Sequence, residues 1–188
     1  MEPGSMMDRI SVLRLTIPES ERGGYAYSEL KKLSCDAELT NKQNIFSKIG
    51  VGARDVKFKI RHNGYLELDD RILWRDLHCF ITSIIPIDRL YDEVDCAIVP
   101  ISQCKLIEHG EPDGPTFPGI LTEQYVRYQE PADPYSTQVV GYALITPKQI
   151  MIAAGSLVEI CDTAYHVQTV HALDPHKNEY GIVKVSDL

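Results

Sequence analysis

Two stretches of the sequence decide the fold: RILWRDLHCFITSII over residues 71–85 and LVEICDTAYHVQTVH over residues 157–171. They align without a gap when the 188-residue chain is shifted against itself by 86 positions. A strand pattern and its turns then recur in the same order, which is typical of a tandem repeat. The matching pairs are Phe58 with Leu144, Leu66 with Ile152, Ile72 with Val158, Trp74 with Ile160, Asp76 with Asp162, Ile81 with Val167, Ser83 with Thr169, Ile84 with Val170, Ile87 with Leu173, Asp88 with Asp174 and Glu93 with Glu179.

Each copy is predicted to alternate short strands with turns. Residues 56–60 alternate apolar and polar side chains, as half-buried strands do. Asn63-Gly64 supplies residues that tolerate positive φ in a turn. The expected strands of the first copy are residues 56–60, 65–68, 71–74, 79–85 and 93–99, with a turn at 75–77 and a loop at 86–92. Those of the second copy are residues 139–145, 149–152, 157–160, 164–170 and 179–185, with a turn at 154–155 and a loop at 173–178.

The segment in front of each copy is less regular. Residues 9–16 and 33–39 are expected to be strands, and residues 41–49 to form one or two helical turns. Residues 105–107 are the expected opening strand of the second copy. The remaining predictions are a loop or linker over residues 109–119, an extended segment over 121–129 and a long loop over 130–138.

These elements predict a mainly β chain of two tandem small domains, each a β-barrel or β-sandwich with long loops and little helix. The first domain is expected over residues 8–102 and the second, repeat-related domain over residues 103–188. Closing a sheet into a barrel removes the unpaired edges that short strands otherwise expose. Because Trp74 shares its register with Ile160, it is predicted to pack in the interior rather than stack on a ligand.

The composition is that of an ordinary globular protein and argues against several functional classes. Hydrophobic residues make up 44% of the chain and charged residues 24%. The net charge of −8 argues against a protein that grips nucleic acid, because such domains are usually basic. No apolar run reaches the length of a membrane span. The cysteines are odd in number and form no CxxC pair, which indicates free thiols and a reducing compartment. They are Cys35, Cys79, Cys96, Cys104 and Cys161.

No motif predicts an active site, a cofactor site or a metal site. The nucleotide-binding glycine motifs and the GxSxG serine elbow are absent. An H-x-E match at His109 and Glu111 lacks the P-C-x-x-C partner of the zinc deaminases. His166, His171 and His176 recur every five residues, which alternates faces on a strand, so packed or solvated histidines are favoured over a metal site. We therefore expect no enzymatic activity, and no catalytic, cofactor-binding or metal-binding residues.

Two carboxylate clusters are the remaining candidates for chemistry. Paired carboxylates can hydrolyse glycosides, but these flank turns or line the polar face of a strand, so solvated charge is favoured. Asp88 and Asp174 begin matching loops, where an aspartate commonly accepts hydrogen bonds from N–H groups two residues on. The clusters are Glu67, Asp69 and Asp70, and Asp92, Glu93 and Asp95.

Segments of the first copy resemble the head–tail joining, or head-closure, proteins of tailed phages. They are LSCDAEL over residues 33–39, VKFKIR over 56–61, DRILW over 70–74 and FITSII over 80–85, followed by Asp88. The family typically has a V-x-A-x-V strand, a V-x-F-x-I-R strand and a D-R-I-x-x-x-G-x-x-Y-x-I hairpin. This chain departs from the pattern at the hairpin glycine, where Asp76 or Leu77 stands, and at the tyrosine, replaced by Cys79-Phe80. The resemblance covers about residues 8–100, and the second half shares it only through the repeat.

The resemblance implies a structural phage or prophage protein that assembles between the portal or adaptor and the tail. Its expected partners are other phage structural proteins and further copies of itself, as a homo-oligomeric ring in the virion and a monomer in solution. DNA is expected to pass through the ring without specific binding, because an acidic lumen has the same sign of charge as DNA. No membrane is involved, and the expected location is the virion, with the host cytoplasm during assembly. Known members usually have one domain, so a fused second copy allows one chain to supply two subunit positions.

Other functional classes stay open. An enzyme or small-ligand binder on a β-barrel scaffold predicts a pocket lined by titratable groups with shifted pKa values. A peptide-binding adaptor predicts a groove of exposed aromatic residues. The tyrosines that could supply such a groove are Tyr125, Tyr128, Tyr135 and Tyr142.

Overall fold

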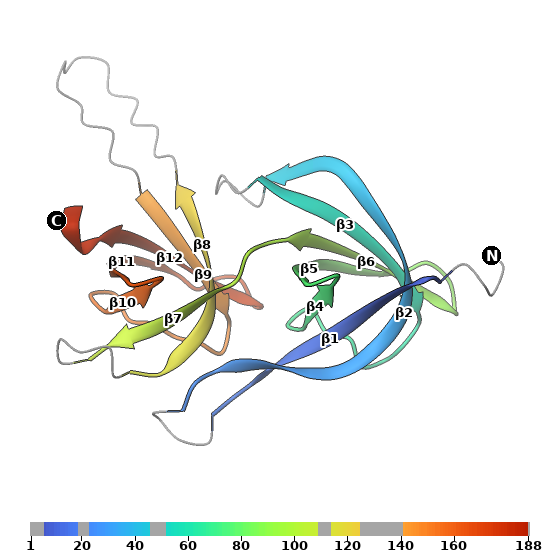
Figure 1. Cartoon of the computed structure of the whole chain (residues 1–188), viewed down its shortest axis with the longest axis horizontal. Helices are drawn as coiled ribbons and strands as arrows, with labels where there is room; N and C mark the ends of the chain where they lie inside the picture. The colour runs from blue at the N-terminus through green and yellow to red at the C-terminus, as the bar shows by residue number, and fades with distance from the viewer. Residues whose placement is uncertain (1–5, 19–22, 46–51, 109–113, 125–140, 188) are drawn as a thin grey trace, which may run out of the picture.

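The computed structural model describes residues 6–18, 23–45, 52–108, 114–124 and 141–187. Two barrels lie side by side along the long axis of the molecule (Figure 1). The strands of the first barrel are β1 (Asp8–Thr16), β2 (Ala26–Ile45), β3 (Gly52–Arg61), β4 (Arg71–Trp74), β5 (Leu77–Pro86) and β6 (Tyr91–Ile98). Those of the second are β7 (Ser102–Ile107), β8 (Thr116–Gln124), β9 (Gly141–Pro147), β10 (Leu157–Ile160), β11 (Thr163–His171) and β12 (Lys177–Lys184), followed by the 3-10 helix η1 (Val185–Asp187).

Both barrels are closed, antiparallel and built with the same strand order. In the first barrel the order is β1, β2, β3, β6, β5 and β4, and β4 pairs again with β1. In the second it is β7, β8, β9, β12, β11 and β10, and β10 pairs again with β7. The prediction of a mainly β chain with two tandem β-barrels is confirmed.

The repeat spacing of 86 residues, found in the sequence, is also the spacing between equivalent strands of the two barrels. β4 and β10 are 86 positions apart at both ends, and so are β6 and β12. The hairpin turn after β4 has φ values of 49° at Arg75 and 63° at Asp76, and the turn after β10 has 49° at Cys161 and 60° at Asp162. Positive φ at both central residues is the type I′ turn, whose twist matches that of the paired strands. The turn predicted at residues 75–77 is therefore confirmed.

Side chains from the strands fill the interior of each barrel. Trp74 is 3% exposed and packs edge to face on Phe58, with ring centroids 5.6 Å apart, so the prediction of a packed tryptophan is confirmed. In the second barrel Tyr165 packs in the same manner on Tyr142, also at 5.6 Å. The other buried core residues include Ile10, Val56, Ile60, Ile72, Ile81 and Val94 in the first barrel, and Phe117, Leu144, Val158, Ile160, Val167 and Ile182 in the second.

The strand predicted over residues 65–68 is wrong, because this segment forms turns. The N–H group of Leu66 donates to Oδ1 of Asn63 at 3.2 Å, and that of Glu67 donates to Oδ2 of Asp70 at 2.9 Å. Local side chains thus occupy the donors that a neighbouring strand would need.

The strand predicted over residues 149–152 is wrong for a related reason. The hydroxyl of Tyr180 accepts a hydrogen bond from the N–H of Ile152 at 3.1 Å and donates to the carbonyl of Ile150 at 3.0 Å. One core tyrosine therefore satisfies this backbone from inside the barrel, while the two isoleucines close the end of the core.

The helical turns predicted over residues 41–49 are wrong for residues 41–45, and the rest lies outside the described residues. β2 continues to its end at Ile45, and Asn44 lies opposite Ala53 of β3. A register shift between Thr40 and Gln43 marks a bulge, which lets a long strand bend without leaving the sheet.

The loop or linker predicted over residues 109–119 is wrong from Thr116 onward, where β8 begins. Gly119 serves close packing there, since a Cβ atom would lie 2.7 Å from Leu144 Cδ1 and 2.8 Å from Cys104 Sγ. The extended segment predicted over 121–129 is β8 as far as Gln124. Its remainder, residues 109–113 and the loop predicted over 130–138 lie outside the described residues.

The type I′ turns give a first prediction. Substitution Asp162→Val is expected to lower the free energy of unfolding by about 1–2 kcal/mol, because a β-branched residue is strained in the left-handed region. Urea denaturation measures this value. Thr163→Val, one residue later on β11, is the control and is expected to change it by less than about 0.5 kcal/mol. Equal effects of the two substitutions would contradict the turn assignment.

Candidate functional site

The main feature outside the two cores is the seam between the barrels, which is apolar at its centre. Phe80, Ala97 and Val99 of the first barrel form a buried cluster with Ile120, Ala143 and Ile145 of the second. All six are at most 7% exposed. Burial of each large side chain contributes roughly 1.5–3 kcal/mol. The seam therefore stabilises the contact between the two barrels.

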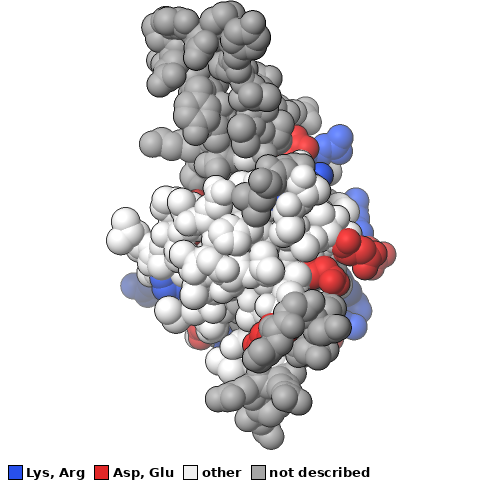
Figure 2. Space-filling view, turned by 90° about the vertical axis from the view of Figure 1, so that its left-hand side faces the viewer, with Lys and Arg blue, Asp and Glu red and all other residues white. Residues whose placement is uncertain are grey.

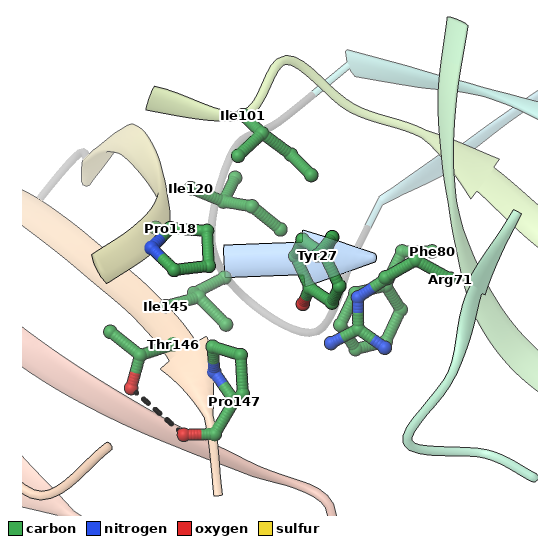
Figure 3. A pocket seen from close by; sticks show the side chains of 10 residues that line it. Tyr27, Arg71, Phe80, Ile101, Pro118, Ile120, Ile145, Thr146 and Pro147 are labelled. Atoms are coloured by element: carbon green, nitrogen blue, oxygen red, sulfur yellow. Dashed lines mark hydrogen bonds between the residues drawn. The ribbon is translucent and has the colours of Figure 1, made fainter. Parts of the chain in front are cut away.

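A buried cation lies at the edge of this cluster. The guanidinium of Arg71 lies 3.9 Å from the ring centroid of Phe80 and 5.9 Å from that of Tyr27. Figure 3 shows these three side chains facing the apolar residues of the second barrel, among them Ile120 and Ile145.

Two hydrogen bonds of this guanidinium are made to backbone carbonyl groups. Nη1 donates to the carbonyl oxygens of Asp70 at 2.9 Å and Asp69 at 3.4 Å. Arg71 is 3% exposed, and burial lowers its pKa below the ordinary arginine value. Stacking and backbone hydrogen bonds thus hold the buried cation in place.

Polar contacts join the two barrels at the edge of the apolar cluster. The N–H of Tyr25 donates to the carbonyl of Thr116 at 2.7 Å, which links the start of β2 to the start of β8. On another side, His176 Nδ1 lies 2.9 Å from Asp69 Oδ1. The loop that carries His176 is held by Lys148, whose Nζ donates to two of its carbonyl groups. These directional bonds fix the orientation of one barrel on the other.

The prediction that both carboxylate clusters are solvated is wrong for two of their members. Asp70 is 1% exposed, and its two oxygens accept hydrogen bonds from Arg14 at 2.7 and 2.9 Å. Asp92 is 3% exposed and lies 2.8 Å from His62 Nδ1. Each thus has a basic side chain as its partner, and Asp70 also accepts the hydrogen bond from the N–H of Glu67. The remaining members of the clusters, Glu67, Asp69, Glu93 and Asp95, are more exposed and pair with Arg14, His176 and Lys57.

The three evenly spaced histidines are not brought together. His171 is exposed and His176 pairs with Asp69, while His166 lies on the outer face of β11. Among the described residues, no group of three or more His, Cys, Asp or Glu side chains could hold a metal ion. Nor does any helix in the described ranges have the length and apolarity needed to cross a membrane.

The role predicted for the two loop aspartates is confirmed. Asp88 Oδ1 accepts hydrogen bonds from the N–H groups of Leu90 at 2.7 Å and Tyr91 at 2.9 Å. Asp174 Oδ1 accepts one from the N–H of His176 at 2.8 Å. Of the tyrosines considered for a peptide groove, Tyr142 is half-buried against the second core, and Tyr125, Tyr128 and Tyr135 lie outside the described residues.

Sequence analysis missed the seam, although the sequence contains a signal for it. On a strand with only one buried face, apolar and polar residues alternate. Residues 143–145 and 79–81 are instead continuously apolar, and the structure buries both faces of β9 and β5 there. A run of this kind indicates an outer face that another element covers.

The five cysteines form no disulfide, and burial separates four of them from the fifth. Burial raises the pKa of Cys35, Cys79 and Cys104 to about 12, and that of Cys96 is raised well above its ordinary value. Cys161, in the β10–β11 turn, is exposed.

The seam gives a second prediction. Substitution Ile145→Asp places a charge against Phe80 and is expected to lower the free energy of unfolding by about 3 kcal/mol. Because Ile145 points out of its barrel, circular dichroism should stay that of a β protein while X-ray scattering shows a larger radius of gyration. Leu173→Asp, at a fully exposed position, is the control and should change neither value. An unchanged radius with Ile145→Asp would count against a stabilising seam.

The thiols give a third prediction. Iodoacetamide at pH 8 is expected to label one cysteine of the native protein, Cys161, because only an accessible thiolate reacts. Mass spectrometry counts the labels, and substitution Cys161→Ser should reduce the count to none. Five labels are expected in urea. Labelling of any core cysteine under native conditions would contradict the burial described above.

Comparison of the sequence with models of protein families finds no match, and comparison with the curated proteins finds none either.

Proposed function

We propose that this chain is a non-enzymatic structural protein of the head–tail connector of a tailed phage or prophage, which assembles between the portal or adaptor and the tail. In this proposal the protein forms a homo-oligomeric ring in the virion and is a monomer in solution. It works in the virion, and in the host cytoplasm during assembly. The observation that carries the proposal is the construction of the molecule as two filled barrels locked by an apolar seam.

Filled barrels support an assembly role because they leave only their outer surfaces for function. The barrel interiors hold large apolar side chains such as Phe58, Trp74, Phe117 and Tyr180. The carboxylates that sequence analysis singled out each pair with a basic side chain, either alone or two to one cation. A rigid body that presents surfaces suits a connector, which must transmit contacts from one neighbour to the next.

The resemblance to head–tail joining proteins adds a second line of support. The segments that carry it lie in β2, β3, β4 and β5 of the first barrel, and the loop aspartate that follows them begins the β5–β6 loop. The barrel of the second half has the same strand order, so one chain would supply two barrels to the ring.

The charge distribution fits a channel that DNA traverses without binding. Residues 1–100 contain 14 basic and 16 acidic residues, whereas residues 101–188 contain 5 and 11. The net charge is therefore −2 in the first half and −6 in the second. A lumen lined by the second half would repel the DNA backbone and let the duplex slide.

A peptide-binding or ligand-binding adaptor is the second candidate, favoured by a groove on the first barrel. The groove has a volume of about 570 Å³ and is lined by residues that include Lys31, Lys32, Arg61 and Tyr65. Both lysines already have partners, since Lys31 lies over the ring of Tyr65 and Lys32 pairs with Glu29. Titration with an acidic peptide would test this candidate, and micromolar binding lost on Arg61→Glu would favour it over the connector.

The connector proposal gives a fourth prediction. The purified chain is mixed with DNA-filled, tail-less heads of the encoding phage that lack their own connector, and purified tails are then added. The chain is expected to co-sediment with the heads and to restore tailed, infectious particles. Heads that retain their connector are the control and should not bind it. Failure both to bind the defective heads and to restore tail joining would overturn the proposal.

A further inference from the structure

The second barrel packs on a row of residues on the outer face of the first barrel. The repeat places an equivalent row on the outer face of the second barrel. In the first barrel Arg71, Phe80 and Ala97 lie side by side across β4, β5 and β6. The residues 86 positions later are Leu157, His166 and Val183. The strand registers place these three side by side across β10, β11 and β12. We call Leu157, His166 and Val183 the outer row.

The outer row has the chemistry of a contact surface. Its three side chains are half-buried, and Ala164 beside them is half-buried as well. Val185, the counterpart of the seam residue Val99, is 41% exposed. Figure 2 views the end of the molecule at which β10 lies, and the described part of its centre is free of lysine, arginine, aspartate and glutamate. The row itself contains no Lys, Arg, Asp or Glu, and Glu159, which lies opposite Ala164, borders it.

In the seam, an apolar face of the second barrel covers the first barrel. A second copy of the chain has no exposed face of this kind to cover the outer row. The face that covers the first barrel, with Ile120, Ala143 and Ile145, is already buried in every copy. The equivalent positions of the first barrel, from the strand pairing and the 86-residue spacing, are Asp36, Lys57 and Lys59. Charged side chains there would lose their hydration against valine and leucine.

We infer that the outer row is a docking surface for another protein of the connector assembly. The partner presents an uncharged face of two antiparallel strands with branched apolar side chains, as β8 and β9 do in the seam. The inference rests on the proposed function, since it names the surface by which the chain meets the next protein of the head–tail joint. Association is driven by the burial of the row.

Charge introduced into the row gives a fifth prediction. Substitution Val183→Lys is expected to lower the yield of tailed particles in the head and tail reconstitution by about ten-fold or more. Ile87→Lys is the matched control, because it changes an apolar residue that is 47% exposed on a loop of the first barrel, and it should keep the wild-type yield. Circular dichroism and thermal unfolding verify that both variants fold.

The outcomes separate the inference from the proposed function. If the wild-type chain fails to restore tail joining, the proposed function falls. If the wild type succeeds and Val183→Lys succeeds equally, the docking surface is wrong and the proposed function stands. If sedimentation velocity shows a wild-type dimer that Val183→Lys disperses, a second copy occupies the row and the inference is overturned.

A second measurement keeps the test decisive if Val183→Lys does not fold. The photoreactive residue p-benzoylphenylalanine is placed at position 166, and the reconstituted particles are irradiated. The expected product is a cross-link between this chain and a different structural protein, identified by mass spectrometry. A cross-link only to another copy of the chain, or none in particles that have joined their tails, would overturn the inference.

Discussion

The closure of each barrel depends on its shortest strand. β4 and β10 have four residues each, and they pair on one side with the opening strand and on the other with the strand after the type I′ turn. Without these ladders each sheet would be open, and its two edges would expose unpaired N–H and carbonyl groups. Closure also fixes which residues point outward, because side chains alternate between the two faces of a strand. The outer surface of β4, β5 and β6 is therefore set by the same pairing that seals the core.

The seam follows from this outward placement. Once Ile72 and Ile81 point into the core, their neighbours Arg71 and Phe80 must point out. A phenylalanine on an outer face is unfavourable in water, and in this molecule it is covered by β8 and β9. The arginine beside it is accommodated because its guanidinium stacks on aromatic rings and donates to carbonyl groups. The register of β4 and β5 thus determines both which side chains pack in the core and which ones contact the second barrel.

The elements that sequence analysis predicted best are those defined by local pattern. The strand at residues 71–74, its counterpart at 157–160 and the turn at 75–77 were predicted from the pattern of the local chain segment. The errors arose where the backbone conformation is determined by hydrogen bonds to side chains or by residues far away in the sequence. Asn63 takes a donor of the segment predicted as a strand at 65–68.

The candidate site was harder to foresee for the same reason. Asp70 looked solvated because its partner, Arg14, is 56 residues away in the sequence. Gly119 suggested a loop, but its role is to let β8 approach Leu144 and Cys104. The seam depends on how two repeats dock, which a comparison of the repeats with each other does not reveal. Only the continuous apolar runs on β5 and β9 pointed to it.

Lys57 and Lys59 on the outer face of the first barrel oppose the addition of further barrels end to end. A contact between two unlike faces of a repeated unit can recur from one unit to the next, so identical repeats that use it add end to end into a ring or, where the rotation does not close, into a fibre. Lys57 and Lys59 occupy the positions that Ala143 and Ile145 hold in the second barrel. Their charge makes the first barrel a poor addition to the end of another chain. The two repeats thus share the residue pattern that builds a barrel. They differ on the outer face that would let further barrels be added, which is apolar in the second barrel and charged in the first.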